Sequence, residues 1–343
     1  MQRLSVWPNR STGPAYAAPV ILSVRHEEIS RHYFTHECIF GTRPLFSLLA
    51  ALVGQEFANV LHLKSLYSRY PPAMFSSTPF TRRAALTAIA AIVAMPACAY
   101  AAAPIAWCTL APGLEHGQAA LAAHIGDGQL HIVRIDPAHF RFALASAAAT
   151  GGGYRTARRW AEERGFSAVI NAGMFQSGGA PVGYAKADGR VIQPHLNSNL
   201  SVFAFDDRRA RLLDLSCDTF DPSREKNALQ GIRMVACDDR NVWSPQARRW
   251  SIAAIAQDRG GRILFLHTRS PHSVHDFINA LLALPLSIVR MMYQEGGPEA
   301  TLFVSVGGFE LERIGSFETG FNENDDNLVA WPLPNVFGVC PRQ

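Results

Sequence analysis

The sequence lacks the short motifs that identify several large classes of enzyme. It contains no Gly-x-Ser-x-Gly segment, which disfavours serine hydrolase chemistry, and no His-Glu-x-x-His segment of the zinc-protease type. The glycines at 151–153 precede a predicted helix but lack the spacing of either nucleotide-binding motif, so an ordinary loop is favoured over a phosphate site. His267, His272 and His275 form no recognised metal signature. We therefore expect no cofactor and no metal.

Charge is also sparse. Only 17% of the 343 residues are charged and the net charge is +4, with no basic stripe that interleaves with aromatic residues. Nucleic acid is therefore not an expected partner. A hydrophobic content of 48% is ordinary for a globular protein, and no strong short-period repeat is present. The sequence does not indicate an oligomeric state.

One apolar segment near the N-terminus resembles an export signal. Within Pro72–Ala103, Arg82 and Arg83 precede an apolar run that ends in small residues, a pattern typical of a signal peptide of the twin-arginine type. The run is interrupted by Pro96 and is too short for a membrane span. We therefore expect residues 1–73 to be absent from the mature protein, residues 74–103 to be a signal peptide, and residues 104–343 to form a periplasmic or secreted domain.

Four cysteines follow this signal: Cys108, Cys217, Cys237 and Cys340. An oxidising compartment permits three pairings of four cysteines. A bond between Cys217 and Cys237, which closes a short loop, is the first choice, and a bond between Cys108 and Cys340 would tie the two ends of the domain. The alternative, that some of these thiols are free and buried, stays open.

Strands and helices are interspersed along the mature chain without strict alternation. Alternating or short apolar runs predict strands at 129–135, 140–146, 167–170, 200–205, 210–215, 250–257, 262–268 and 287–293. Thr156 and Ser273 are suitable N-caps for two helices, which Gly165 and Pro285 should end. The predicted fold is a single main domain of the α/β or α+β class, with a mixed β-sheet core and flanking helices.

Two passages about 120 residues apart share one arrangement. In 155–175 and in 273–299, a predicted helix leads through an apolar strand into a polar turn with glycine, at Asn171–Gly173 and at Glu295–Gly297. Chemistry in α/β proteins gathers at the carboxyl ends of strands. The two turns are therefore expected to place an amide and a carboxylate around one ligand.

Four motifs in this order resemble the phosphodiester glycosidase family: 171–175 (NAGMF), 230–233 (QGIR), 249–251 (RWS) and 295–299 (EGGPE). The resemblance spans Leu114–Val339 and implies hydrolysis of a sugar-1-phosphodiester at its glycosidic bond. The chain departs from the family at Glu295, where Asp-Gly-Gly is common.

The residues themselves suit this chemistry. An oxocarbenium-like transition state calls for carboxyl groups, with Glu295 as the first candidate and Glu299 as the second. Arg233 and Arg249 are candidates for binding the phosphate, because a guanidinium donates two hydrogen bonds at once. Asn171, assigned here with Glu295 to the catalytic set, can both donate and accept hydrogen bonds.

Further residues are predicted to line the same cleft. Gly173, Gly296 and Gly297 would let a ligand approach the backbone closely. The remaining predicted binding residues are polar, with His195 and Asn197 as weaker members of the same set: Gln230, Asn199, His195 and Asn197.

The predicted function is that of an exported hydrolase acting on sugar phosphodiesters in envelope or extracellular glycans. The alternative is a non-catalytic periplasmic glycan-binding protein with the same fold, because a fold does not fix a function. If the Glu295 carboxylate is free in a cleft, the enzyme hypothesis is favoured. If it is held in a structural salt bridge, the glycan-binding hypothesis is favoured.

The N-terminal boundary can be tested directly. Translation is expected to start at Met74, so mass spectrometry of the exported protein should find no peptide from before that residue. A chain that begins at Pro104 should unfold cooperatively, because the upstream segment shows no core pattern. An upstream peptide would refute the start site, and the loss of a cooperative transition would refute the domain boundary.

Overall fold

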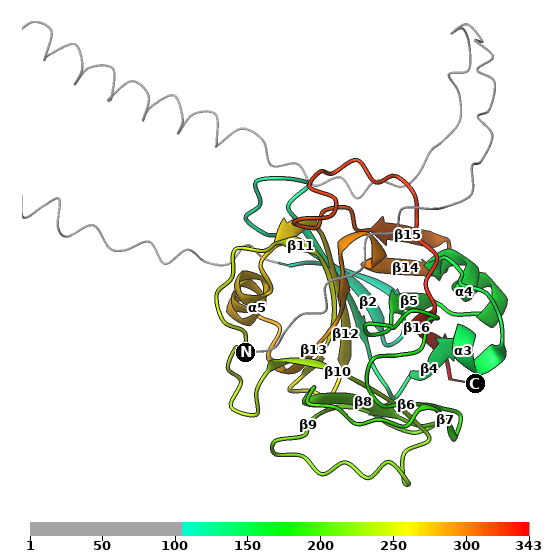
Figure 1. Cartoon of the computed structure of the whole chain (residues 1–343). Coiled ribbons are helices and arrows are strands. Elements are labelled where there is room, and N and C mark those ends of the chain that lie inside the picture. The colour runs from blue at the N-terminus through cyan, green and yellow to red at the C-terminus, as the bar shows by residue number, and fades with distance from the viewer. Residues whose placement is uncertain (1–104, 343) are drawn as a thin grey trace, which may run out of the picture. The chain divides into compact units, whose positions relative to one another are not determined.

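The computed structural model describes residues 105–342, which form two packed β-sheets with few helices (Figure 1). The predicted signal peptide and the segment before it lie outside the described residues. None of the helices in 105–342 is long and apolar enough to cross a membrane.

The larger sheet has eleven strands. Its order is β1-β2-β3-β12-β11-β13-β10-β6-β7, with the hairpin β8–β9 attached to β10. In that order the strands are β1 (Ala106–Ala111), β2 (Leu114–Ala120), β3 (Gln129–Ile135), β12 (Ile263–His272), β11 (Trp250–Asp258), β13 (Ile288–Gly296), β10 (Asn227–Val235), β6 (Ala185–Ala187), β7 (Arg190–Gln193), β8 (Ser201–Phe205) and β9 (Ala210–Asp214).

The smaller sheet has five strands in the order β15-β14-β5-β16-β4. These are β15 (Phe309–Ile314), β14 (Thr301–Val306), β5 (Ala168–Asn171), β16 (Asn335–Pro341) and β4 (Phe140–Ser146). The helices are α3 (Ala147–Thr150), α4 (Ala157–Arg164), α5 (Val274–Ala283) and the 3₁₀ turn η1 (Gly297–Glu299).

The predicted mixed sheet is wrong in its strand directions. Every pair of named strands within 105–342 is antiparallel. A parallel pair needs a crossover connection, usually helical, and the helices here are too few to supply many. The domain is therefore rich in antiparallel sheet, and the flanking helices are a minor part of it.

The core lies between the two sheets, with helices on the outer faces. Apolar residues from both sheets, such as Phe265 from β12 and Leu302 from β14, pack into one cluster. Helix α5 covers the outer face of the larger sheet with Phe277 and Ile278, and α4 covers the smaller sheet with Trp160 (Figure 1). The sandwich thus has two sheets inside and one helix on either side.

Both predicted helices begin where their caps indicate. Thr156 accepts a hydrogen bond from the Arg159 backbone N–H, and Ser273 accepts one from that of Asp276. Helix α4 ends at Gly165 in the left-handed conformation, and α5 ends at Ala283, just before Leu284 and Pro285. These ends are fixed by local sequence and position the two strands that follow.

A row of buried histidines crosses the larger sheet. His131 on β3 pairs with His267 on β12, and His267 pairs with Ala253 on β11. Ala253 in turn pairs with Glu295 on β13, so the row ends at a carboxylate. His116 stacks on His131, with 3.1 Å between its Nε2 and the Nδ1 of His131. Directly paired residues share one sheet face.

The predicted bond between Cys217 and Cys237 is confirmed, with their α-carbons 6.6 Å apart. Cys108 and Cys340 are free thiols in the structure, so the second pairing is not formed. The Cys340 Sγ donates instead to the Gly165 carbonyl at 3.4 Å.

Loss of this disulfide should destabilise the domain. Cys237→Ser removes a link across 20 residues, and the expected loss in free energy of unfolding is about 2–4 kcal/mol. The matched change Cys108→Ser, at an exposed free thiol, should alter stability by less than about 0.5 kcal/mol. Urea unfolding under non-reducing conditions measures both, and equal effects would contradict a structural role for the bond.

Candidate functional site

The two polar turns singled out in the sequence meet in the structure, although they follow strands of different sheets. The backbone N–H of Gly173, after β5, donates to the Gln294 side chain in β13 at 2.9 Å. The backbone N–H of Thr301 donates to the Asn171 Oδ1 at 3.1 Å. The first bond joins the ends of the two sheets, and the second links β5 to its neighbour β14 in the smaller sheet. Together they define the place where the predicted chemistry would occur.

A β-bulge in β13 shapes this place. Ala254 pairs with Tyr293 and Ala253 pairs with Glu295, so Gln294 is an extra residue in the ladder. Bulges of this kind bend a strand and change the direction of its side chains, often beside active sites. Here the extra residue supplies the bond to Gly173 and leads directly into Glu295.

The two glycines after the bulge allow tight packing. A Cβ on Gly296 would lie 2.1 Å from Trp250 and 2.6 Å from the Tyr293 hydroxyl oxygen. Gly297 has φ of +67°, and a Cβ there would lie 2.7 Å from a carboxylate oxygen of Glu318. Glycine at these positions therefore lets an indole ring and a carboxylate approach the backbone, where the sequence suggested that a ligand would.

Glu318 is the residue that the sequence did not single out. It reaches the site because its backbone bridges Trp250, and because Thr319 and Arg249 are joined by backbone and hydroxyl hydrogen bonds. Glu295, Glu299 and Glu318 thus gather around the Gly296–Gly297 turn, and all three are half-buried.

None of these three carboxylates forms a salt bridge within the described residues. Glu295 accepts one long bond of 3.3 Å from the Gly296 backbone N–H. Burying a carboxyl group without a cation disfavours its charged form. The cluster is therefore costly to fold, and clustered groups of this kind are common at functional sites.

Burial raises the pKa of each carboxyl group, and repulsion by a neighbouring glutamate adds to this at Glu295 and Glu299. Burial, followed by the nearby Glu299, holds the pKa of Glu295 well above its usual range. Burial, with a contribution from Glu318, raises the pKa of Glu299 to about 7. The pKa of Glu318 is also raised by burial, an effect that Arg248 opposes. All three groups therefore hold a proton more tightly than an exposed carboxyl group does.

Unpaired hydrogen-bond donors lie beside the same turn. The Asn171 Nδ2 and the Trp250 Nε1 are buried and have no hydrogen-bond partner in the described part of the chain. Asn171 itself is only 2% exposed, and its oxygen is already bonded to Thr301. Donors left in this state are available to a ligand.

Other predicted residues lie in structural contacts. The Nη1 of Arg233 donates to both carboxylate oxygens of the buried Asp214 at 2.8 Å and to Ser216. Gln230 bonds the backbones of Tyr184, Asn197 and Asn199, so it secures a loop. Binding of substrate by Arg233, Gln230 or Asn199 stays a prediction.

Arg249 is exposed and lies near His272 and Asp276. Burial, followed by the charge of Arg249, lowers the pKa of His272, and the hydrogen bond from His275, with a small contribution from Arg249, lowers the pKa of Asp276. Arg248 is also exposed and is the cation that acts on Glu318. His195 is exposed on the loop that Gln230 secures. The one grouping of metal-ligand type in 105–342 is Asp214, Cys217 and Cys237, and its two cysteines are bonded to each other.

Comparison with protein families assigns the chain to a family. The phosphodiester glycosidase family matches residues 164–340, which is more than half of the chain, and the chain belongs to that family. The matched range includes both polar turns and all three carboxylates. A comparison with curated proteins found no match.

Two solved structures are similar over most of the domain. A hypothetical protein from Synechocystis is 15% identical with a TM-score of 0.51, over 70% of this chain and 64% of that one, and shows the shared fold. This chain thus spans about two thirds of the length of that protein. The catalytic domain of zebrafish N-acetylglucosamine-1-phosphodiester alpha-N-acetylglucosaminidase is 12% identical with a TM-score of 0.47, over 69% of this chain and 82% of that one.

The proton affinities of the cluster can be measured. Carbon-13 NMR of labelled glutamate carboxyl groups, assigned with Glu299→Gln, should show Glu299 titrating near pH 7. Glu318→Gln removes a neighbouring negative charge, so the pKa of Glu299 should fall in that variant. A Glu299 carboxyl that titrates near its usual value of 4.5 would show that the cluster is solvated rather than buried.

Proposed function

We propose that the protein hydrolyses the glycosidic bond of a sugar-1-phosphodiester at the Glu295–Glu299–Glu318 cluster. The observation that carries this proposal is the presence of three half-buried carboxyl groups without a salt-bridge partner among the described residues. Family membership supports a glycosidase-type activity. The substrates we propose are phosphodiester-linked sugars of envelope or extracellular glycans.

The raised pKa values suggest a division of roles between two of the groups. Glu295, whose pKa is held well above its usual range by burial, is suited to donate a proton to the bridging oxygen as the phosphate leaves. Glu299, whose pKa is about 7, is partly ionised at neutral pH and is suited to activate water or to stabilise positive charge on the sugar. Carboxyl groups in different environments can take different acid and base roles at one pH.

A protonated cluster also lowers the electrostatic barrier to an anionic substrate. Three ionised carboxylates would repel a phosphodiester, whereas a neutral Glu295 does not. The unpaired donors of Asn171 and Trp250 are suited to donate hydrogen bonds to phosphate or sugar oxygens. Arg248 and Arg249, both exposed beside the site, are suited to attract the phosphate through their charge.

The disulfide supports a location outside the cytoplasm. A bond between Cys217 and Cys237 persists in oxidising compartments and is rare in the reducing cytosol. This agrees with the twin-arginine type of signal predicted from Arg82 and Arg83. We therefore propose a periplasmic or secreted enzyme.

Glu295→Gln should lower kcat by about 10²–10⁴-fold and leave substrate binding intact, since Gln has nearly the same shape but cannot donate a carboxylic proton. Hydrolysis of a panel of sugar-1-phosphodiesters, with the released sugar quantified, is the measurement. Glu162→Gln is the control because Glu162 lies on the surface of α4, with a side chain that is 53% exposed, and it should keep parent activity. Arg249→Ala should instead raise KM at least as much as it lowers kcat.

Two results would decide against this function. Parent-like turnover by Glu295→Gln would remove Glu295 from the chemistry and leave Glu299 as the next group to test. Tight glycan binding without turnover of any phosphodiester, by the parent protein, would favour the glycan-binding alternative.

A further inference from the structure

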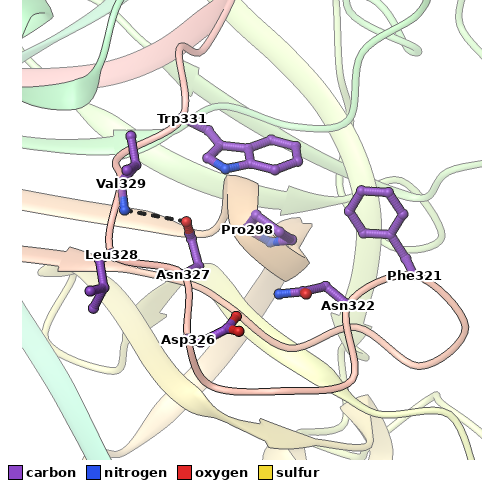
Figure 2. Close-up of a pocket in the computed structure, with 8 residues that line it drawn as sticks. All are labelled: Pro298, Phe321, Asn322, Asp326, Asn327, Leu328, Val329 and Trp331. Carbon is purple, nitrogen blue, oxygen red and sulfur yellow. Dashed lines mark hydrogen bonds between the residues drawn. The ribbon is translucent and has the colours of Figure 1, made fainter. Parts of the chain in front are cut away.

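A pocket of about 460 Å³ adjoins the carboxylate cluster and is lined by aromatic residues (Figure 2). It shares Pro298 with the turn that carries Glu295 and Glu299. On its other sides are Phe321 and Trp331, whose ring centroids are 6.1 Å apart and whose planes meet at 84°. Figure 2 shows the Trp331 and Phe321 rings close to Pro298, with the side chains of Asn322 and Asp326 below it.

Exposure of these side chains is unusual for the domain. Phe321 is 65% exposed, Leu328 is 85% exposed and Val329 is 68% exposed, the three highest values among the large hydrophobic residues of 105–342. A patch of this kind, next to polar groups, marks a binding surface rather than a random surface position. All three residues belong to one segment, residues 315–331, which we call the 315–331 loop.

Hydrogen bonds and an ion pair from strands β11 and β12 fix the 315–331 loop to the larger sheet. Arg269 on β12 donates to the carbonyls of Ile314, Asp325 and Asn327 at 2.8–3.0 Å, and its Nε lies 2.6 Å from the Asp325 carboxylate. Ser251 on β11 accepts from the backbone N–H groups of Ser316 and Phe317.

Bonds within the loop complete its shape. The Nδ2 of Asn322 donates to the Ser316 carbonyl and that of Asn327 to the Gly315 carbonyl, each at 2.7 Å. The exposed rings therefore stand on a cross-linked frame. Binding to such a surface requires little ordering of the protein.

Charge identifies the class of ligand. The lining contains one charged residue, Asp326, whose carboxylate is exposed and has no hydrogen bond or salt bridge among the described residues, and it contains no cation. A phosphate group would be repelled there. A neutral sugar ring suits it, because its C–H face can stack on an aromatic ring while its hydroxyl groups donate to a carboxylate.

We propose that the pocket lined by Phe321 and Trp331 is a carbohydrate subsite that binds a neutral pyranose ring of the glycan next to the cleaved bond. Trp331 provides the stacking surface, Phe321 provides the side wall, and Asp326 accepts hydrogen bonds from hydroxyl groups. This assignment rests on the proposed function for the identity of the bond cleaved, but not for the binding of the sugar. It makes the enzyme selective for glycans over simple alkyl phosphodiesters.

The test compares two substrates that share the sugar-1-phosphate and differ in the group beyond the phosphate, one methyl and one oligosaccharide. Trp331→Ala and Asp326→Asn should each lower kcat/KM for the oligosaccharide by about ten-fold and leave kcat/KM for the methyl substrate within two-fold. Trp331→Phe should retain most of the preference, because a smaller aromatic surface remains. Val191→Ala, at another exposed apolar residue, is the control and should leave both values unchanged.

A binding readout separates this proposal from the proposed function. Isothermal titration of the same oligosaccharide into Glu295→Gln and into Glu295→Gln with Trp331→Ala needs no turnover. A ten-fold weaker affinity in the second protein supports the subsite even if no phosphodiester is hydrolysed. Equal affinities, no detectable binding to Glu295→Gln, or an equal loss on both substrates would overturn the proposal. Thermal unfolding of each variant confirms that its fold is retained.

Discussion

The candidate site depends on two buried hydrogen bonds from side-chain oxygens, one of which joins two sheets that otherwise contact each other through apolar packing. Gln294 uses its side-chain oxygen to hold the backbone N–H of Gly173 from the opposite sheet, and Asn171 uses its own to hold the backbone N–H of Thr301 on the neighbouring strand of the same sheet. Both side chains are nearly inaccessible, so the bonds form away from water and an unpaired partner there would cost about 1–3 kcal/mol. Because the bond from Gly173 to Gln294 fixes one turn against the other, the position of Glu295 is set by the packing of the two sheets.

In this arrangement, the atoms that fix the structure differ from the atoms that are available for chemistry. The oxygen of Asn171 is taken by Thr301, and its amide nitrogen is left free beside the turn. The bulge in β13 divides these tasks in the same way. Gln294 forms the bond to the other sheet, and the next residue, Glu295, carries the carboxyl group. A site built in this manner can leave three acids poorly solvated because the surrounding fold supplies the necessary stability.

Local sequence was sufficient for much of the fold. The caps at Thr156 and Ser273 predicted both main helices, and alternation gave β3 and β4 with the bounds seen in the structure. Strand direction was not predictable, because it is set by which distant strands pair, and no antiparallel partner is encoded in the residues of one strand.

The same limit applied to the site. Asn171 and Glu295 stood out because each follows a strand and precedes glycine, which is a local pattern. Glu318 lies in an irregular loop and approaches only through the contacts of Trp250 and Arg249, so no spacing could identify it. Arg233 was predicted to bind phosphate, but its guanidinium forms an ion pair with the buried Asp214. Asp214 is 19 residues away in the sequence, so this pairing could not be predicted from a local pattern.

The row of histidines that ends at Glu295 gives the domain two opposing responses to acid. Burial and the charge of Arg313 lower the pKa of His116 to about 4 and that of His131 to about 3, and burial lowers that of His267 to about 4. The unfolded chain therefore binds more protons at these groups below pH 6.5, and their contribution to stability is lost as the pH falls toward 4. Glu299 acts in the opposite sense, because its raised pKa lets the folded state keep a proton that the unfolded chain releases between pH 4.5 and about 7. Between about pH 4.5 and 6.5 these two changes in the free energy of unfolding partly cancel. As the pH falls, the stability gained at the buried Glu299 therefore offsets part of the stability lost at the buried neutral histidines.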